Sequence, residues 1–145
     1  MDDKSYFSNR LKELMYENNL NTVQLAKATE ISNSRISDWL NHNISPYLSS
    51  LVKLSDYFSC SIDFLAGRTE EPTLNLSKEQ STFAIRLKIL IEKNKVSNYK
   101  IAKDLGFQRN LISKWLLGGG TVLLNLIKLA DYFDCTIDFL VGRSD

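Results

Sequence analysis

Apolar residues recur every three or four positions along most of the chain, which is the spacing of an amphipathic helix with one buried face. One such face consists of Phe7, Leu11, Leu14 and Met15. A later one consists of Leu51, Leu54 and Phe58. No segment alternates apolar and polar residues over a sustained stretch, so we expect no β-sheet. The pattern therefore predicts an all-α fold.

The same pattern occurs twice. The segments DYFSCSIDFLAGR and DYFDCTIDFLVGR begin 75 residues apart and are identical at ten of thirteen positions. Upstream, a shift of 76 residues aligns Arg10 with Arg86 and Trp39 with Trp115. The apolar faces recur as Phe83, Leu87, Leu90 and Ile91, and as Leu126, Leu129 and Phe133. A repeat of this length predicts two copies of one unit of about 60 residues.

Residues suited to helix ends predict five short helices in each copy. A short polar side chain at the N-cap accepts a hydrogen bond from the first turn, which makes Gln108 a weaker cap than Ser32. The expected N-caps of the second, third and fifth helices are Asn21, Ser32 and Ser61, and then Ser97, Gln108 and Thr136. Gly67 and Gly142 are placed to end the fifth helix in a left-handed conformation.

The linker between the copies is short. The expected parts are a first domain of residues 1–68, a linker of residues 69–76 and a second domain of residues 77–145. Pro72 interrupts any helix in the linker. Ser77 and Gln80 have the spacing of a capping box, so we expect the first helix of the second copy to open there.

Composition is that of an ordinary globular protein, 43% hydrophobic and 24% charged. No apolar run approaches the roughly 18 residues that a membrane helix needs. The N-terminal residues are charged and lack the apolar core of a secretory signal. Two cysteines, Cys60 and Cys135, do not make a disulfide framework. A cytoplasmic location is expected, with no membrane partner.

The small net charge of +1 hides an asymmetry between the copies. Residues 1–72 carry 7 Lys/Arg and 10 Asp/Glu, a net charge of −3. Residues 73–145 carry 11 Lys/Arg and 7 Asp/Glu, a net charge of +4. Because a protein that grips phosphates gathers positive charge, the second copy is better suited to nucleic acid than the first.

Residues that carry catalysis or bind metals are too few for an enzyme. His42 is the only histidine, and Cys60 and Cys135 are expected to be buried inside their own units, so no nucleophile–base pair is available. The glycines Gly118 to Gly120 follow a helix and lack the Lys and Ser/Thr of a phosphate-binding loop. We expect no catalytic residue, no cofactor and no metal site.

The second and third helices of each copy carry a specific pattern, NYKIAKDLGFQRNLISKW in the second copy. Ala102 is its fifth residue, Gly106 its ninth, Ile112 its fifteenth and Trp115 its eighteenth, which is the layout of a helix-turn-helix. With two helices following, each copy resembles the phage-repressor/Cro family, often called the XRE family. The resemblance implies two repeated five-helix lambda-repressor-like domains, with both tryptophans in the core.

In that family the third helix enters the major groove with its N-terminal residues facing base edges. The resemblance implies base contacts by Arg109, Asn110, Ser113 and Lys114, and in the first copy by Asn33, Ser34, Arg35 and Ser37. The implied phosphate contacts are Asn98, Lys100, Gln108 and Thr22. The chemistry fits, because Arg bridges O6 and N7 of guanine and Asn bridges N6 and N7 of adenine.

The first copy departs from the family pattern. Asp38 stands where the second copy has Lys114 and repels phosphates. Glu30 replaces the turn glycine, where a side chain costs roughly 1 kcal/mol, and His42 replaces a glycine after the third helix. In the second copy, the glycines from Gly118 supply backbone N–H groups but no charge to a loop that often holds a phosphate-binding Lys or Arg.

The sequence thus predicts a sequence-specific DNA-binding transcriptional regulator with double-stranded DNA as its partner. A repressor of a phage, mobile element or bacterial operon is the expected form. The alternative is a protein-interaction module, in which the first copy or both copies form a homodimer or bind a protein partner. The altered face and acidic balance of the first copy keep that alternative open.

Overall fold

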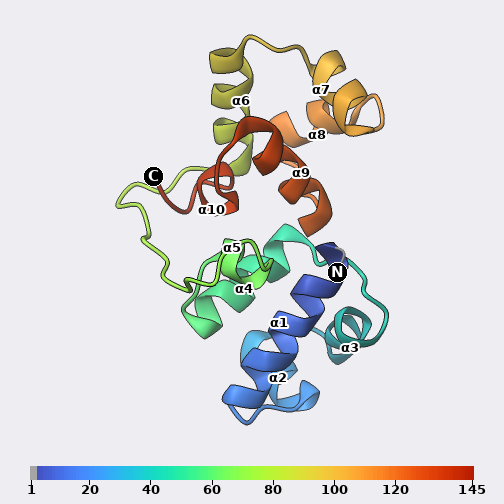
Figure 1. Cartoon of the computed structure of the whole chain (residues 1–145), viewed down its shortest axis with the longest axis vertical. Coiled ribbons are helices and arrows are strands. Elements are labelled where there is room, and N and C mark those ends of the chain that lie inside the picture. The colour runs from blue at the N-terminus through green and yellow to red at the C-terminus, as the bar shows by residue number, and fades with distance from the viewer. Residues whose placement is uncertain (1–2) are drawn as a thin grey trace. The chain divides into compact units, whose positions relative to one another are not determined.

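The computed structural model describes the backbone of residues 3–145 and the side chains of residues 6–145. Within these residues the chain forms ten helices and no strand, which confirms the all-α class. The chain divides into two compact units, one formed by the residues up to Leu74 together with Val122–Leu124, and one formed by the other residues from Asn75 onward (Figure 1). None of the helices described is long and apolar enough to cross a bilayer.

Each unit contains five helices. Those of the first unit are α1 (Asp3–Glu17), α2 (Thr22–Thr29), α3 (Asn33–Asn41), α4 (Leu48–Phe58) and α5 (Ile62–Leu65). Those of the second unit are α6 (Phe83–Asn94), α7 (Asn98–Leu105), α8 (Leu111–Leu116), α9 (Leu123–Phe133) and α10 (Ile137–Leu140). The two units therefore present the same order of helices, in which the first helix is the longest and the fifth, of four residues, is the shortest.

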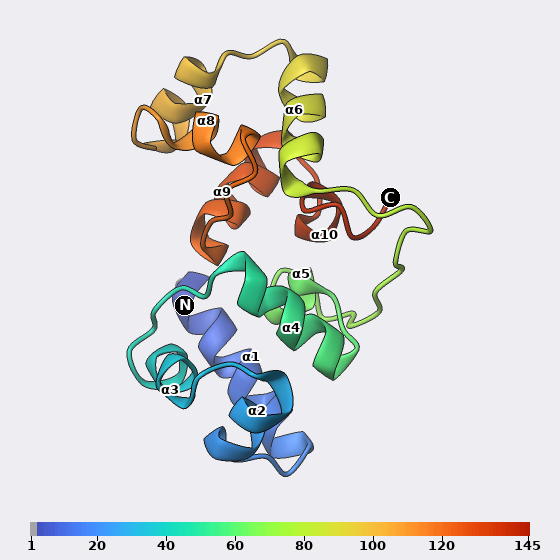
Figure 2. The same ribbon diagram turned by 180° about the vertical axis from the view of Figure 1, so that it is seen from behind.

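The helices pack in matching pairs within each unit (Figures 1 and 2). In the first unit α1 contacts α3 and α5, and α2 contacts α3 and α4. In the second unit α6 contacts α8 and α10, and α7 contacts α8. Trp39 is 3% exposed and Trp115 is 1% exposed, so both are core residues, as predicted. Their burial fixes the third helix of each unit against the first.

The fifth helix of the first unit ends in a left-handed glycine turn, as the sequence predicts. Ser61 caps the start of α5 by accepting a hydrogen bond from the Phe64 amide at 2.9 Å. At the other end Gly67 has a φ of 75° and its amide donates to the Phe64 carbonyl. The Arg68 amide donates to the Asp63 carbonyl at 2.9 Å, which completes a Schellman motif.

The second unit repeats this ending. Gly142 has a φ of 84° and its amide donates to the Phe139 carbonyl. The Arg143 amide donates to the Asp138 carbonyl, and the two side chains form an ion pair at 3.7 Å. In the first unit the equivalent pair, Arg68 with Asp63, lies at 2.9 Å. The repeated sequence at the end of each copy is therefore explained by a helix stop and its buried carboxylate.

An arginine on the first helix of each unit is bound to the end of the fifth. The Arg10 guanidinium donates to the Phe64 carbonyl at 3.0 Å, pairs with Glu70 at 3.0 Å and lies 4.0 Å from the centre of the Phe64 ring. Arg86 donates to the carbonyls of Phe139 and Ser144, each at 2.8 Å. These contacts join the beginning of each unit to its end.

One predicted helix start is wrong. The capping box expected at Ser77 does not form, because the Ser77 hydroxyl donates to the Asp145 carboxylate at 2.6 Å and to the Glu79 carbonyl. Instead α6 begins at Phe83, and Thr82 caps it by accepting from the Ile85 amide at 3.2 Å. The residues before Thr82 stay outside the helix, and the amides of Ser77 and Ser81 donate to the carbonyls of Arg143 and Gly142, each at 2.9 Å.

The cysteines differ in burial. Cys60 is 2% exposed, as predicted, whereas Cys135 is half-buried and so departs from the expectation. Among the described residues no group of three or more His, Cys, Asp or Glu side chains is placed to hold a metal ion.

Candidate nucleic-acid interface

The first helix-turn-helix is α2, a tight turn and α3. Asn21 caps α2 through a reciprocal pair of hydrogen bonds with Gln24, at 2.8 and 2.9 Å. After α2 the chain turns at Glu30, which has a left-handed φ of 59°. Ser32 then caps α3 by accepting from the Arg35 amide at 3.3 Å. The predicted caps of both helices are confirmed, and α3 begins directly after its cap.

The N-terminal end of α3 presents three of the predicted base-contacting side chains to solvent. Asn33, Ser34 and Arg35 are exposed, whereas Ser37 is half-buried and accepts a hydrogen bond from the Asn41 amide side chain at 3.0 Å. Ser37 is therefore engaged within its own helix. Thr22, the predicted phosphate contact, is half-buried at the first position of α2.

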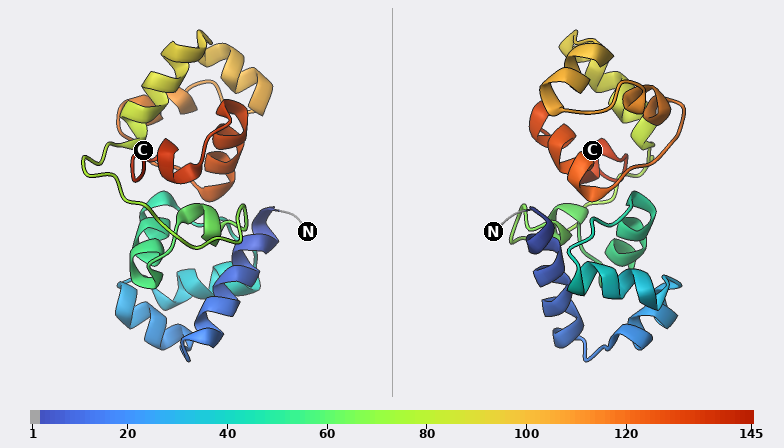
Figure 3. Two further views of the ribbon diagram at one scale, coloured as in Figure 1. Left: turned by 60° about the vertical axis from the view of Figure 1, so that its left-hand side comes forward. Right: turned by 90° about the vertical axis from the view of Figure 1, so that its right-hand side faces the viewer.

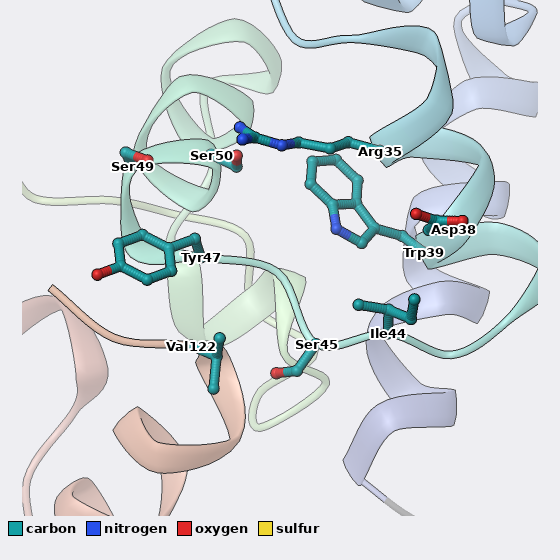
Figure 4. Close-up of a pocket in the computed structure, with 9 residues that line it drawn as sticks. All are labelled: Arg35, Asp38, Trp39, Ile44, Ser45, Tyr47, Ser49, Ser50 and Val122. Atoms are coloured by element: carbon teal, nitrogen blue, oxygen red, sulfur yellow. The ribbon is translucent and has the colours of Figure 1, made fainter.

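Arg35 is also part of a hollow beside α3. In Figure 4 its side chain extends past Trp39 toward Ser50 of α4, while Asp38 lies on the other side of the ring. The loop before α4 adds Ile44 and Tyr47, which are 50% and 47% exposed. The face of the first unit next to the predicted reading residues therefore combines a cation, a carboxylate and exposed apolar groups.

The second helix-turn-helix is α7, a turn and α8. Ser97 caps α7 by accepting from the Lys100 amide at 3.0 Å, as predicted, and Gly106 turns the chain with a φ of 73°. The third helix differs from the prediction, because Gln108 does not cap it. α8 begins only at Leu111, and Asn110 occupies its N-cap without a side-chain capping bond. A glutamine lacks the short side-chain oxygen that closes a capping turn.

The four base-contacting candidates of the second unit lie together on an exposed stretch. Arg109 and Asn110 are in the turn before α8, and Ser113 and Lys114 are on its first turns. All four side chains are exposed. Positions 110, 113 and 114 are three and four residues apart, so they share one face of the helix. Ile112 and Trp115 are buried on the opposite side.

The glycines after α8 form a tight return rather than an open loop. The Gly119 amide donates to the Lys114 carbonyl at 3.0 Å, and Gly118 has a φ of 107°. A Cβ added to Gly119 would lie 3.0 Å from that carbonyl oxygen. The Gly119 N–H, one of the backbone groups suggested by the sequence for phosphate binding, is therefore already hydrogen-bonded within this turn.

The predicted phosphate contacts of the second unit have different settings. Asn98 is half-buried at the start of α7, Gln108 is exposed in the turn, and Lys100 is exposed. The Lys100 ammonium donates to the Asp104 carboxylate at 3.0 Å. The Tyr132 hydroxyl donates to the same carboxylate oxygen at 3.0 Å. Lys100 is therefore already paired within its unit.

The contacts among Lys100, Asp104 and Tyr132 shift the pKa of each of these side chains. The hydrogen bond from Lys100, followed by that from Tyr132, lowers the pKa of Asp104 below its usual range. The hydrogen bond to Asp104 raises the pKa of Lys100. Desolvation, with the hydrogen bond to Asp104 second, raises the pKa of Tyr132. All three shifts favour the charged pair with a protonated tyrosine.

The sequence interpretation missed Asp104 as the partner of Lys100. The signal was present, because the two residues are four apart on one helix and carry opposite charges. It also missed Tyr99, whose side chain is 74% exposed next to Asn98 at the start of α7. A tyrosine hydroxyl is one of the groups that proteins use to contact phosphate oxygens.

The match to a family model lies in the first unit. Residues 10–70 match the family model of the Cro/C1-type HTH DNA-binding domain. Among solved structures, the chain is similar to the crystal structure of a transcriptional regulator from Listeria innocua, with 24% identity and a TM-score of 0.39. That similarity covers 67% of this chain and 83% of the other. No curated protein matches the chain.

Proposed function

We propose that this chain, whose residues 10–70 match the family model of the Cro/C1-type HTH DNA-binding domain, is a transcriptional regulator that binds double-stranded DNA. The proposal includes repression, by occupation of a promoter. Such a regulator works in the compartment that holds the DNA, so a bacterial cytoplasm or nucleoid is its proposed location. The observation that carries the proposal is the exposed polar face of the third helix in each unit, next to a capped second helix.

The second unit is proposed to be a second copy of the same domain, with residues 1–68 and 77–145 as the two domains. The same order of five helices, the N-caps Ser61 and Thr136, and the two glycine turns support this. A duplicated domain gives one chain two reading heads. Tethering two weak heads raises their joint affinity through effective concentration.

The second unit is the proposed main reading head. Arg109 is suited to guanine and Asn110 to adenine, and Ser113 and Lys114 extend the same exposed face. The net charge of +4 over residues 73–145 favours approach to DNA. In the proposed complex Asn98, Gln108 and Thr22 contact phosphates, and Lys100 does so after exchanging Asp104 for a phosphate.

The test is fluorescence anisotropy with mixed-sequence duplex DNA across a salt series, since phosphate contacts make binding fall with salt. Three variants are compared with the wild type. They are Arg109→Ala/Lys114→Ala, Asn33→Ala/Arg35→Ala, and a control on α1 and α4, Lys12→Ala/Lys53→Ala, which removes the same two charges as the first variant. Circular dichroism verifies that each variant keeps its helices.

The expected result is a large loss of affinity for the Arg109→Ala/Lys114→Ala variant, a smaller loss for the Asn33→Ala/Arg35→Ala variant and none for the control. Loss in both face variants but not in the control makes the chain a two-headed DNA binder. If the control weakens binding as much as the face variants do, general charge and not these faces holds the DNA. A wild-type protein that does not bind at low salt contradicts the proposal as a whole.

A second candidate function applies to the first unit. Its α3 face has Asp38 where α8 has Lys114, and beside it Ile44 and Tyr47 are about half exposed. Exposed apolar groups rimmed by charges are typical of protein interaction sites. On this alternative the first unit binds a protein partner or a second copy while the second unit reads DNA. The Asn33→Ala/Arg35→Ala variant then keeps full DNA affinity.

A further inference from the structure

The hollow beside α3 has the size of a site for a small molecule. Its volume is about 460 Å³, which lies in the range of pockets that hold small organic ligands. Eight of its nine lining residues lie between Arg35 and Ser50, and the ninth, Val122, belongs to the same compact unit. The loop of residues 42–47, which joins α3 to α4 (Figure 3), forms one of its walls.

A buried hydroxyl group faces this hollow without a partner. Ser50 is 3% exposed and lines the hollow. In Figure 4 its hydroxyl points toward the guanidinium of Arg35. The Ser50 amide donates to the Tyr47 carbonyl at 3.0 Å, but the hydroxyl forms no hydrogen bond with any residue that the structure describes. Because a buried polar group without a partner is costly, this hydroxyl is suited to a ligand that enters the hollow.

Two positive features lie next to Ser50. The Arg35 side chain is exposed and forms no ion pair within the described part of the chain. Helix α4 has eleven residues and Tyr47 at its N-cap, and no side chain caps its first turn. The N-terminus of a helix carries partial positive charge and favours anions. A guanidinium, a buried hydroxyl and an uncapped helix start together suit a carboxylate or a phosphate group.

The rest of the hollow is apolar apart from one carboxylate. In Figure 4 the Trp39 ring lies between Arg35 and Asp38, with Ile44 nearby. Trp39 offers a flat apolar wall, against which an aromatic or aliphatic group packs. Asp38 repels a second negative group at its end of the hollow. The lining therefore favours a ligand with one anionic group and an apolar body.

The second unit lacks this chemistry. The repeat places Leu111 at the position of Arg35 and Asn125 at the position of Ser50. The Asn125 side-chain amide donates to the Thr121 hydroxyl at 2.9 Å, so it is already satisfied. The same five-helix unit therefore forms without a cation and an open hydroxyl at these positions, and folding does not account for them in the first unit.

We propose that the hollow binds a small organic anion, with its carboxylate or phosphate group on Arg35, Ser50 and the start of α4 and its apolar body against Trp39. Ser50 lies below the surface, so its partner must enter the hollow, which favours a compact ligand over the surface of a folded protein. Binding itself is independent of DNA. A regulatory effect, in which the ligand takes Arg35 from the DNA, rests on the proposed function.

An NMR titration of the full chain with phenyl phosphate and with inorganic phosphate, both without DNA, tests the site. The expected result is a saturable shift of the Ser50 amide and the Trp39 indole, with tighter binding of phenyl phosphate because inorganic phosphate has no apolar body. Arg35→Ala is expected to weaken phenyl phosphate binding by about tenfold, through loss of a charge-assisted hydrogen bond. Lys12→Ala, which removes an exposed charge from α1, is the control and is expected to bind as the wild type does.

Ser50→Ala separates a ligand role from a structural one. It is expected to weaken phenyl phosphate binding by about threefold, through loss of one hydrogen bond. Its thermal midpoint should stay at or above that of the wild type, because the substitution removes a buried hydroxyl without a partner. Ser50→Ala with wild-type affinity for phenyl phosphate contradicts the proposed site.

Three further outcomes overturn the proposal. They are no saturable shift with phenyl phosphate, equal affinity for the two probes, and equal weakening by Lys12→Ala and Arg35→Ala. If duplex DNA shifts the Ser50 amide and phenyl phosphate does not, the hollow contacts the DNA backbone, and the small-molecule site is wrong while the proposed function stands. A chain that binds phenyl phosphate but no DNA supports the site and contradicts the proposed function.

Discussion

The two helix-turn-helix segments share one plan and differ at the start of the third helix. In the first unit Ser32 caps α3, and the helix runs from Asn33 for nine residues. In the second unit Gln108 stands in that place, and α8 begins only at Leu111 and has six residues. One capping side chain therefore decides whether the candidate DNA-contacting residues lie on a helix or in the turn before it.

Their electrostatics differ in the same region. The first unit has Asp38 where the second has Lys114, and Gln24 and Ala28 where the second has the Lys100–Asp104 pair. A third helix with a carboxylate opposes phosphate binding, whereas one with a lysine favours it. The two units therefore share an architecture while their third helices differ in charge.

Removing the buried tryptophans is the strongest way to test how alike the two cores are. Trp115 contacts the rings of Phe83 and Phe107, whereas Trp39 contacts Phe7. Truncation of a buried tryptophan costs about 3–5 kcal/mol. We expect Trp115→Ala to lower the free energy of unfolding more than Trp39→Ala, by about 1 kcal/mol for the additional aromatic pair.

Urea denaturation of the two variants measures this difference. Phe107 is the distinguishing neighbour, because the first unit has Ile31 in its place. A Phe107→Ile background should therefore make the two tryptophan substitutions equally costly. Equal losses in the unaltered background, or a greater loss for Trp39→Ala, would show that the extra ring contact does not stabilise the second unit.

Exchanging the charges on the third helices tests whether electrostatics separates the two faces. Asp38→Lys gives α3 the charge of α8, and Lys114→Asp gives α8 the charge of α3. If each lysine contacts one phosphate, the slope of log affinity against log salt changes by about one in opposite directions for each face. Anisotropy titrations at several salt concentrations measure the slope. An unchanged slope for Lys114→Asp rules out a phosphate contact there.

The turn residues allow a reciprocal test of stability. Gly106 and Glu30 both have left-handed backbones, at φ values of 73° and 59°. No atom lies within 4 Å of a Cβ added to Gly106, so Gly106→Ala acts through the backbone alone. It is expected to destabilise the second unit by about 1 kcal/mol, and Glu30→Gly to stabilise the first by up to ~1 kcal/mol. Thermal unfolding measures both, and shifts of the same sign contradict the prediction.

The smallest expected effect is on the free energy of unfolding at acid pH. Because the folded pKa of Asp104 is depressed, its ion pair stabilises the protein above the unfolded pKa of about 3.9. That contribution is lost as pH falls through the folded pKa. Asp104→Asn should make the free energy of unfolding less dependent on pH in this range. It should also lower the pKa of Lys100 toward its usual value. Titration by NMR measures the carboxyl and ammonium groups directly, and a normal pKa for Asp104 in the wild type contradicts the prediction.

Much of the fold could be predicted because its signals are local. The apolar faces, the caps Asn21, Ser32 and Ser97 and the glycine turns at Gly67 and Gly142 each depend on residues a few positions apart. The all-α class follows from the same spacing. Local chemistry of this kind is visible in the sequence before any tertiary contact is known.

The errors arose where distant residues compete for a group. Ser77 has the local spacing of a cap, yet it bonds to Asp145, which is 68 positions away. Cys135 is half-buried although its equivalent, Cys60, is fully enclosed. No local pattern encodes these outcomes, because each depends on tertiary packing.

The contacts between the two ends of the first unit affect when that unit folds during synthesis. Arg10 bonds to Phe64 and Glu70, and the Ser61 amide donates to the Pro72 carbonyl at 3.0 Å, so this network cannot form before residue 72 has been synthesised. The remaining 73 residues take roughly 4–15 s to synthesise at about 5–20 residues per second. Small helical domains fold within milliseconds. Each new chain is therefore expected to carry a finished first unit for several seconds before its second unit exists.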